Sequence, residues 1–392
     1  MKRLWMCAFG LVVGLAAPMG TPVLAQSAPA NPPAQQQKPA QQPTDDSAGP
    51  DSGTDGIVVG KKSTEDVPPP APAEEKVKNP NNETFSMRVD VPIVNLDVDV
   101  LLDKTHQFVP GLKPDNFLVT EDGVEQKVQS VRLTKTPITA VMLLEFASNS
   151  YWFINDMQNA AVAFFRTLQP EDYVAVATYD IRTHILCDFT NNQATIAQAL
   201  QSLMIPGFSE TNEFDALYEM LDRLTRVDGR KYIILISSGR DTMSKITLDK
   251  MLAKIKATPN VTIFTISTGG MLREMGGMGG GMGMGGAARH MDYLQADNEM
   301  RTFAEMTGGM WFEPVFQGAL PEVFSQINES IRNQYVVTYR PTNTANDGSY
   351  RKVKVYLVDQ EGKPLKMQDE KGKPVKYSVI ARDGYKAKLP VE

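Results

Sequence analysis

The side chains best placed to hold a ligand follow the apolar run from Ala140 to Leu144. An apolar run without alternation suits a strand covered on both faces of a parallel sheet. The polar residues Glu145, Ser148 and Asn149 come directly after this run. They would therefore lie beyond the carboxyl end of the strand, where open α/β sheets usually hold their ligands. Catalysis there would need a base and a positioned nucleophile, and neither can be named from these residues.

Strands that alternate with helices must position this edge. From Pro137 onwards apolar runs alternate with helical stripes, which predicts a doubly wound, mostly parallel sheet. The predicted strands are Ala140 to Leu144, Tyr173 to Tyr179, Thr183 to Phe189, Tyr232 to Ile236 and Val261 to Ile266. The second and third are so close along the chain that we expect an antiparallel hairpin at the sheet edge.

Three stretches carry a resemblance to a known family. Residues 145–149 read Glu-Phe-Ala-Ser-Asn, residues 211–217 read Thr-Asn-Glu-Phe-Asp-Ala-Leu, and residues 234–241 read Ile-Leu-Ile-Ser-Ser-Gly-Arg-Asp. They are similar, in order, to the Asp-x-Ser-x-Ser loop, the Thr-x-x-x-Asp-Ala-Leu segment and the Thr-Asp-Gly strand end of von Willebrand factor type A domains. The resemblance spans roughly residues 84–386 and is greatest to the VWFA-related secreted proteins of environmental bacteria.

The resemblance implies a metal site that has lost most of its ligands. In the family, five side chains at the carboxyl edge hold a divalent cation such as Mg²⁺ or Mn²⁺. The corresponding residues here are Glu145, Ala147, Asn149, Thr211 and Ser238, and Asp241 stands further along the third loop. Only the threonine is unchanged, and Mg²⁺ usually takes a carboxylate or two together with waters. We expect a degenerate site (a degenerate MIDAS) and no required cofactor; retained Mg²⁺ or Mn²⁺ at Glu145, Asn149, Thr211, Ser238 and Asp241 is the alternative.

By the same resemblance, the edge would be a contact face for a partner. Its residues would be Glu145, Ser148, Asn149, Thr211 and Ser238. Without a metal we expect Glu145, Asn149 and Ser238 to hydrogen-bond among themselves and to cap the helix starts. We therefore predict a non-catalytic module that binds an unidentified protein or envelope component.

The family fold also predicts how the flanking segments are used. Residues 84–135 and 335–392 alternate in polarity as antiparallel strands do, and Asp122-Gly123 is a hairpin turn signal. Because the two ends of a type A domain lie close together, these segments would pair into one β-sandwich. The predicted class is thus an α/β, Rossmann-like type A domain over 136–334, inserted in an antiparallel β-sandwich.

Composition excludes several other functions. A net charge of −6 without a basic cluster argues against nucleic acid as a partner. The chain has no Gly-x-Ser-x-Gly elbow and no phosphate-binding Gly-x-x-x-x-Gly-Lys-Ser/Thr loop, and its three histidines are scattered. We therefore predict that it is not an enzyme. The alternatives left open are a cation-dependent adhesion domain, a metal-handling protein and a hydrolase.

The start of the chain indicates export. Lys2 and Arg3 precede the apolar stretch Leu4 to Ala17, which predicts a signal peptide over residues 1–25, with an uncleaved anchor as the alternative. We expect a secreted or periplasmic protein with no transmembrane segment after cleavage. Residues 26–83 are rich in Ala, Pro and Gln and predict a disordered linker. Cys187 is then the one cysteine of the mature chain, so no internal disulfide is expected.

A Gly/Met-rich segment interrupts the second half of the α/β region. Residues 269–288 contain many glycines, which predicts a flexible surface loop. Its thioethers are soft donors of the kind that Cu(I) prefers, which is the basis of the metal-handling alternative. They belong to Met271, Met275, Met278, Met282 and Met284, with His290 nearby.

Overall fold

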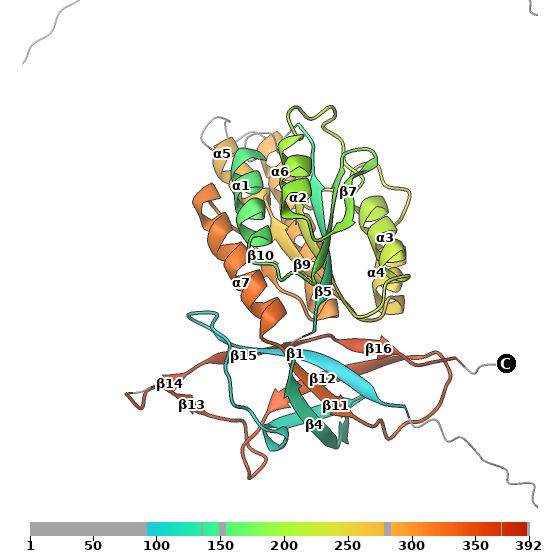
Figure 1. The fold of residues 1–392 in the computed structure, drawn as a ribbon, viewed down its shortest axis with the longest axis vertical. Helices are drawn as coiled ribbons and strands as arrows, with labels where there is room; N and C mark the ends of the chain where they lie inside the picture. The colour runs from blue at the N-terminus through green and yellow to red at the C-terminus, as the bar shows by residue number, and fades with distance from the viewer. Residues whose placement is uncertain (1–91, 135, 149–153, 278–283, 370, 390–392) are drawn as a thin grey trace, which may run out of the picture. The chain divides into compact units, whose positions relative to one another are not determined.

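The computed structural model describes residues 92–134, 136–148, 154–277, 284–369 and 371–389 (Figure 1). All of them belong to one compact unit, Thr84–Glu392. The predicted signal peptide and linker, and residues 84–91 of the predicted N-terminal β segment, lie outside the described residues. Within the described ranges, no helix combines the length and apolarity required to span a bilayer.

A mostly parallel sheet forms the centre of the α/β domain. Among the described residues it has six strands in the order β10-β9-β8-β5-β6-β7. All neighbours are parallel except β6 and β7, which form the expected antiparallel edge hairpin. The strands are β5 (Ile138–Glu145), β6 (Tyr173–Tyr179), β7 (Thr183–Thr190), β8 (Arg230–Ser237), β9 (Val261–Ser267) and β10 (Trp311–Phe312). Cys187, on β7, is half-buried, and burial raises the pKa of its thiol.

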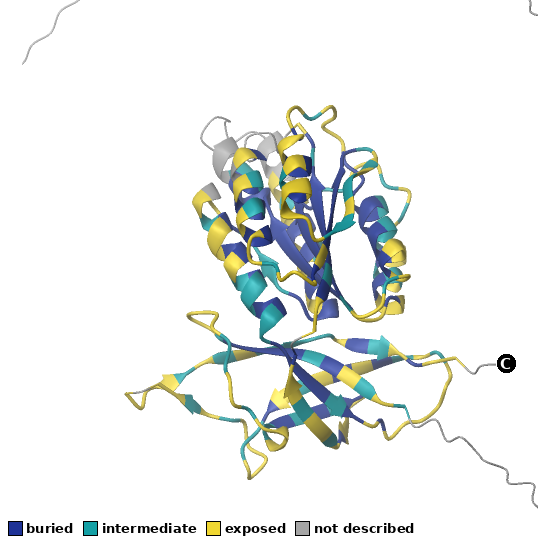
Figure 2. Cartoon of the chain, in the orientation of Figure 1, coloured by how far each residue is buried: buried dark blue, intermediate teal, exposed yellow. Residues whose placement is uncertain are grey.

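Helices cover both faces of this sheet, so its strands are apolar throughout. One face packs against α1 (Ile154–Phe165), α2 (Gln193–Gln201) and α7 (Leu320–Arg332). The other packs against α3 (Glu213–Leu224), α4 (Leu248–Ala257) and α6 (Met284–Thr307). Figure 2 shows the central strands buried and the outer faces of the helices exposed. Burial on both faces explains why the strands lack polar alternation.

The flanking segments pair with each other, as predicted. The described residues place their strands in two four-stranded sheets, ordered β15-β1-β11-β4 and β16-β12-β2-β3. Strand β1 precedes the α/β domain and lies antiparallel between β11 and β15, which follow it. The strands are β1 (Val94–Leu102), β2 (Phe117–Glu121), β3 (Val124–Gln126), β4 (Val128–Leu133), β11 (Tyr335–Tyr339), β12 (Tyr350–Leu357), β15 (Tyr377–Ala381) and β16 (Gly384–Lys386). Shorter elements are η1 (Pro114–Asn116), η3 (Gln317–Ala319), β13 (Met367–Gln368) and β14 (Pro374–Val375).

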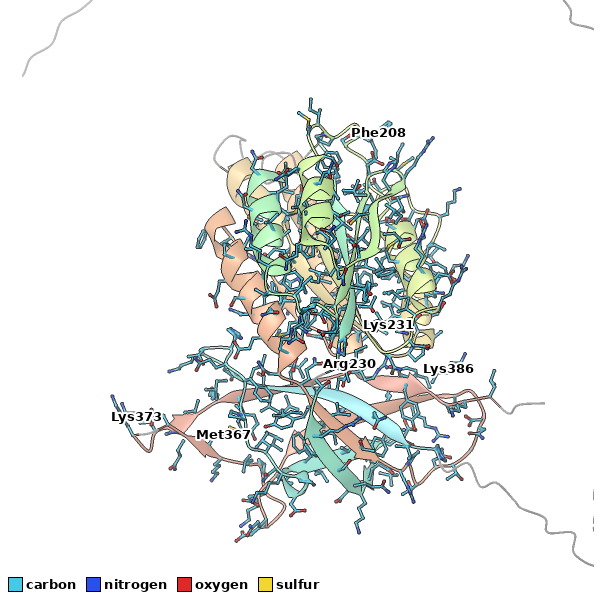
Figure 3. All side chains as sticks on the ribbon, in the orientation of Figure 1. Phe208, Arg230, Lys231, Met367, Lys373 and Lys386 are labelled. Carbon is cyan, nitrogen blue, oxygen red and sulfur yellow. The ribbon has the colours of Figure 1, made fainter. Side chains whose placement is uncertain are left out.

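Arg230, at the start of β8, links the central sheet to the flanking sheets (labelled in Figure 3). Its Nε donates to Asp97 Oδ2 over 3.3 Å, and another guanidinium nitrogen contacts Gln334. Gln334 in turn donates to the buried Asp99. The two β segments and the α/β domain therefore share one buried polar network.

The predicted loop over 269–288 is wrong for residues 269–277 and 284–288, and residues 278–283 lie outside the described ranges. Residues Gly269–Gly277 form helix α5, and α6 begins at Met284. Arg273 on α5 forms ion pairs with Asp297 (2.7 Å) and Glu313, and Met271 is buried. Because these contacts lie far along the chain, local glycine content did not reveal that they hold a helix. Of the proposed Cu(I) thioethers only Met271 has a described environment, and it is buried, whereas the nearby His290 is exposed.

Candidate functional site

Three loops meet at the carboxyl edge of the central sheet. Ser148, after β5, donates its N–H to the carbonyl of Phe208 over 2.8 Å. Thr211 accepts at its carbonyl from the N–H groups of Thr242 (3.0 Å) and Met243 (2.9 Å), which follow β8. The segments around residues 145, 211 and 238 thus form one rim, as the sequence predicted. Parallel strands bring these loops together because all of them end at the same edge.

Glu145 lies beneath this rim and not on it. Its side chain is buried, and Oε2 accepts from the backbone N–H of Ser238 over 2.5 Å and from Ser237 Oγ over 3.0 Å. The predicted contact between Glu145 and Ser238 exists, but through the Ser238 backbone. Asn149, the third member of that predicted network, lies outside the described residues.

A second buried carboxyl group, Glu213, shares this network. It stands in the first turn of α3 and is fully buried. Ser237 Oγ contacts Glu213 Oε2, and the hydroxyl of Tyr179 lies 3.1 Å from the same oxygen. Tyr179 also donates to Ser237 Oγ over 2.7 Å. The hydroxyl of Ser237 therefore lies between two carboxyl groups.

This arrangement holds a proton on one of the two carboxyl groups. A hydroxyl has one proton and can donate to only one carboxylate, so the other contact needs a proton from the carboxyl itself. Burial and the nearby charge of Glu145 raise the pKa of Glu213 to about 8, against the hydrogen bonds from Ser237 and Tyr179. Glu213 Oε1 is buried with no hydrogen-bond partner among the described residues. Glu213 is therefore the protonated member of the pair at neutral pH.

Sequence reasoning missed Glu213, Ser237 and Tyr179. A glutamate in the first turn of a helix is ordinarily a solvated residue that favours the helix dipole, so its type gave no signal of burial. One signal was present, because Glu213 stands two residues after Thr211 inside the segment that carried the resemblance. In the folded protein the first turn of α3 lies against the end of β8, where Glu213 contacts Ser237.

The donors at the rim do not fit a divalent cation. Thr211 donates its hydroxyl to the carbonyl of Arg240, and Ser238 Oγ accepts from the Arg240 N–H at 3.4 Å. Asp241 Oδ1 accepts from Ser244 Oγ over 2.6 Å and from the Phe214 N–H over 3.3 Å. Mg²⁺ needs several oxygen donors converging at about 2.0–2.1 Å, whereas these oxygens are committed to separate protein partners. No group of three His, Cys, Asp or Glu side chains in the described ranges is arranged to hold a metal.

The predicted contact face also needs correction. Glu145, Thr211 and Ser238 are buried, so their side chains cannot meet a partner; Ser148 alone of the described members is exposed. Beside exposed polar residues such as Ser209, Glu210 and Thr242, the rim loops also expose large apolar side chains. They are Met204 (71% exposed), Ile205 (78%), Phe208 (48%) and Met243 (59%). Buried polar side chains tie the loops together from below, and these apolar side chains project outward; Phe208 is labelled at the tip in Figure 3.

An acidic hollow adjoins the third loop. It has a volume of about 450 Å³, and Thr242, next to Met243, lines it. Asp241, Asp292 and Glu299 also line it, with one cation, Arg240, among its described residues. Burial raises the pKa of Asp241 and of Glu299, which shows that water is partly excluded. The rim thus combines exposed apolar side chains with a negatively charged recess.

Residues 148–300 match the family model of the von Willebrand factor type A domain. The solved von Willebrand factor type A protein from Catenulispora acidiphila is 10% identical, with a TM-score of 0.38, over 76% of this chain and 75% of that chain. The vWF domain of the type V pili tip protein Mfa5 from Porphyromonas gingivalis is 13% identical, with a TM-score of 0.37, over 50% and 96%. The PilB minor pilin from Streptococcus sanguinis is 11% identical, with a TM-score of 0.34, over 51% of this chain and 62% of its own length, less than two thirds. No curated protein matches the chain.

Proposed function

Since the chain carries a von Willebrand factor type A domain, as its resemblance to bacterial VWFA-related proteins predicted, we propose that it is a non-catalytic, metal-independent module that binds a protein outside the cytoplasm. The apolar stretch after Lys2 and Arg3 is the support for export. The contact face consists of the exposed residues of the rim. The partner is a protein or another envelope component.

The observation that carries this proposal is the set of exposed apolar side chains on the rim loops. Met204, Ile205, Phe208 and Met243 stand on two loops that hydrogen bonds hold to the end of the sheet. Full burial of one such side chain contributes about 1.5–3 kcal/mol. Aromatic side chains and methionine are also enriched at the centres of protein interfaces. Because hydrogen bonds already order the backbone of this face, binding of a partner over the loops would cost less conformational entropy.

The acidic hollow defines the second feature of the partner. Asp241, Asp292 and Glu299 favour a lysine or arginine of the partner beside its apolar contact. Water exclusion strengthens such a charge-assisted hydrogen bond. The proposed partner surface is therefore apolar with an adjacent basic group.

The hydrogen bonds beneath the rim support the proposed metal independence. Glu145 accepts from Ser237 and Ser238, and Glu213 brings a proton into the same network. A cation would have to displace these donors and that proton before it gained its ligands. Hydrogen bonds to Glu145 and the proton on Glu213 thus compensate the negative charge that a cation would otherwise neutralise.

The test is capture from the native envelope with the full chain as bait. The double variant Ile205→Ser, Phe208→Ser removes the apolar contact, and Tyr356→Ser is the control because Tyr356 is similarly exposed on β12. We expect the wild type and the control to capture the same partner, with EDTA or Mg²⁺ making no difference, and the double variant to lose it.

Two results would reject the proposal. If the double variant captured the partner as well as the wild type, the rim would not be the contact face. If EDTA abolished capture and Mg²⁺ raised the melting temperature, the domain would be a cation-dependent adhesion domain, because a ligand of the folded state stabilises it. A hydrolase screen on the same preparation covers the enzymatic alternative.

A further inference from the structure

A basic cavity lies at the opposite end of the α/β domain from the rim. It has a volume of about 380 Å³. Its walls are the end of α4, the residues before β9, the start of β1, the loop between β11 and β12, and β16. Because it opens at the amino-terminal end of β9, it is separate from the face that Glu145 and Thr211 support.

The charged residues that line this cavity are all basic, and one of them, Arg351, pairs with Glu121, which does not line it. Five cationic side chains line it: Lys256, Arg351, Arg382, Lys386 and Lys388. Among its described lining residues there is no aspartate or glutamate. This contrasts with the chain as a whole, whose net charge is −6. A partly enclosed space with low-dielectric walls concentrates such a potential.

Arg351 places a buried donor in the cavity wall. Its side chain is 2% exposed, and its terminal nitrogens contact Glu121 and the carbonyls of Asn343 and Ala345. Its Nε is buried and has no hydrogen-bond partner among the described residues. A buried donor left without an acceptor is destabilising, so an anion in the cavity that Arg351 lines would compensate its charge.

Arg382 provides a second unsatisfied donor on the same wall. Its Nε is also buried without a partner, and the part of the chain described here offers its guanidinium no ion pair within 4.0 Å. The neighbouring Asp383 contacts the hydroxyl of Tyr350 instead. Burial lowers the pKa of Arg382, while the nearby charges of Asp383 and Asp97 raise it in part.

The remaining wall is apolar. Ile93, Leu96, Ala257 and Pro341 line the cavity beside the two arginines. The volume is within the range of about 300–1,000 Å³ that small-molecule sites occupy. A bare inorganic anion would leave this wall uncovered, whereas an anion with an apolar body would contact both parts.

We propose that this cavity binds a small organic anion, whose carboxylate or phosphate group is held by the positive charge of Arg351 and Arg382 in the wall while its apolar body lies along Ile93 and Pro341. Positive charge suits both headgroups, since carboxylate and phosphate are both anionic acceptors. Lys256 and Lys386 add charge at the mouth. This inference does not rest on the function proposed for the rim.

Calorimetry on the full chain tests the proposal with three probes of equal chain length. Octanoate and octyl phosphate carry the two headgroups, and 1-octanol carries none. Arg382→Gln removes one buried donor and Lys386→Gln a charge at the mouth. Lys373→Gln is the matched control, an exposed lysine at the other end of the flanking sheets (Figure 3).

We expect at least one of the two anions to bind, and the alcohol to bind at least tenfold more weakly. Loss of a charge-assisted hydrogen bond should weaken binding of that anion roughly tenfold to a hundredfold in Arg382→Gln. Lys386→Gln, which tests the site even if the arginine variant fails to fold, should weaken binding severalfold, and Lys373→Gln should not change it. Equal binding of anion and alcohol, equal binding by wild type and Lys386→Gln, or no binding of either anion would overturn the proposal.

Discussion

Replacing Glu213 with glutamine tests the shared proton beneath the rim. Glutamine has the shape of the protonated carboxyl group but cannot ionise. In the wild type, the folded chain keeps this proton up to about pH 8, whereas the unfolded chain releases it near the ordinary glutamate value of 4.5. Between those two values the folded state binds more protons than the unfolded state, so the free energy of unfolding falls as pH rises. The Glu213→Gln variant lacks this dependence.

The size of the effect follows from the raised pKa. Each unit between the two values changes the free energy of unfolding by about 1.4 kcal/mol. From pH 5 to pH 7.5 the variant should therefore gain roughly 3 kcal/mol over the wild type. An imperfect hydrogen bond from the amide to Ser237 lowers the whole curve by about 1 kcal/mol without changing its slope. At pH 7.5 the variant should be the more stable protein.

Urea unfolding of both proteins at half-unit steps from pH 5 to pH 8.5 measures this difference directly. Glu219→Gln is the control, because Glu219 is exposed on the same helix and pairs with Arg223 at the surface. Surface ion pairs contribute about 0–1 kcal/mol, so this control should keep the wild-type slope and differ from the wild type by a small, constant amount. If the wild type gained stability relative to Glu213→Gln with rising pH, or if the difference were constant, the shared proton would be refuted.

Three further predictions concern other buried contacts. Burial raises the pKa of Asp172, but hydrogen bonds from Arg332 and two backbone N–H groups lower it overall. Asp172→Asn should therefore lower the free energy of unfolding by about 3 kcal/mol, measured by urea unfolding at pH 7. This loss should shrink as pH falls below 3.8, and a loss unchanged at pH 3 would contradict the ion pair. Burial raises the pKa of Asp99 to about 7, so Asp99→Asn should become more stable than the wild type as pH rises from 4 to 7, and a falling difference would argue against a protonated Asp99. Arg273→Gln should speed amide exchange in residues 269–277 at least about tenfold, and unchanged protection would show that the ion pairs do not hold α5.

Burial explains why the rim differs from what its residue types suggested. Glu145, Thr211 and Ser238 are polar and stand at a ligand-binding edge, yet all three are buried and serve the loops themselves. Their hydrogen bonds order the backbone that presents Ile205 and Phe208. The polar side chains at this edge therefore stabilise the loops, and the exposed apolar side chains around them are available to a partner.

The sequence by itself determined most strands and helices of the α/β domain and the hairpin of β6 and β7, and the family resemblance added the meeting of three loops at one edge. These follow from hydrophobic periodicity and from the geometry of parallel strands, both of which are local or general. The family resemblance added the pairing of the flanking β segments, which the structure confirms.

Only the tertiary structure decided the state of the site. Glu213 is buried because the end of β8 lies against the start of α3, and the residue types next to Glu213 in the sequence do not indicate this contact. The helix of residues 269–277 likewise depends on Asp297 and Glu313, which are distant along the chain. Periodicity indicates which face of a helix or strand is buried. The protonation of Glu213, the helix in a glycine-rich segment and the missing hydrogen-bond partners of the two arginines depend instead on which distant residues pack against that face.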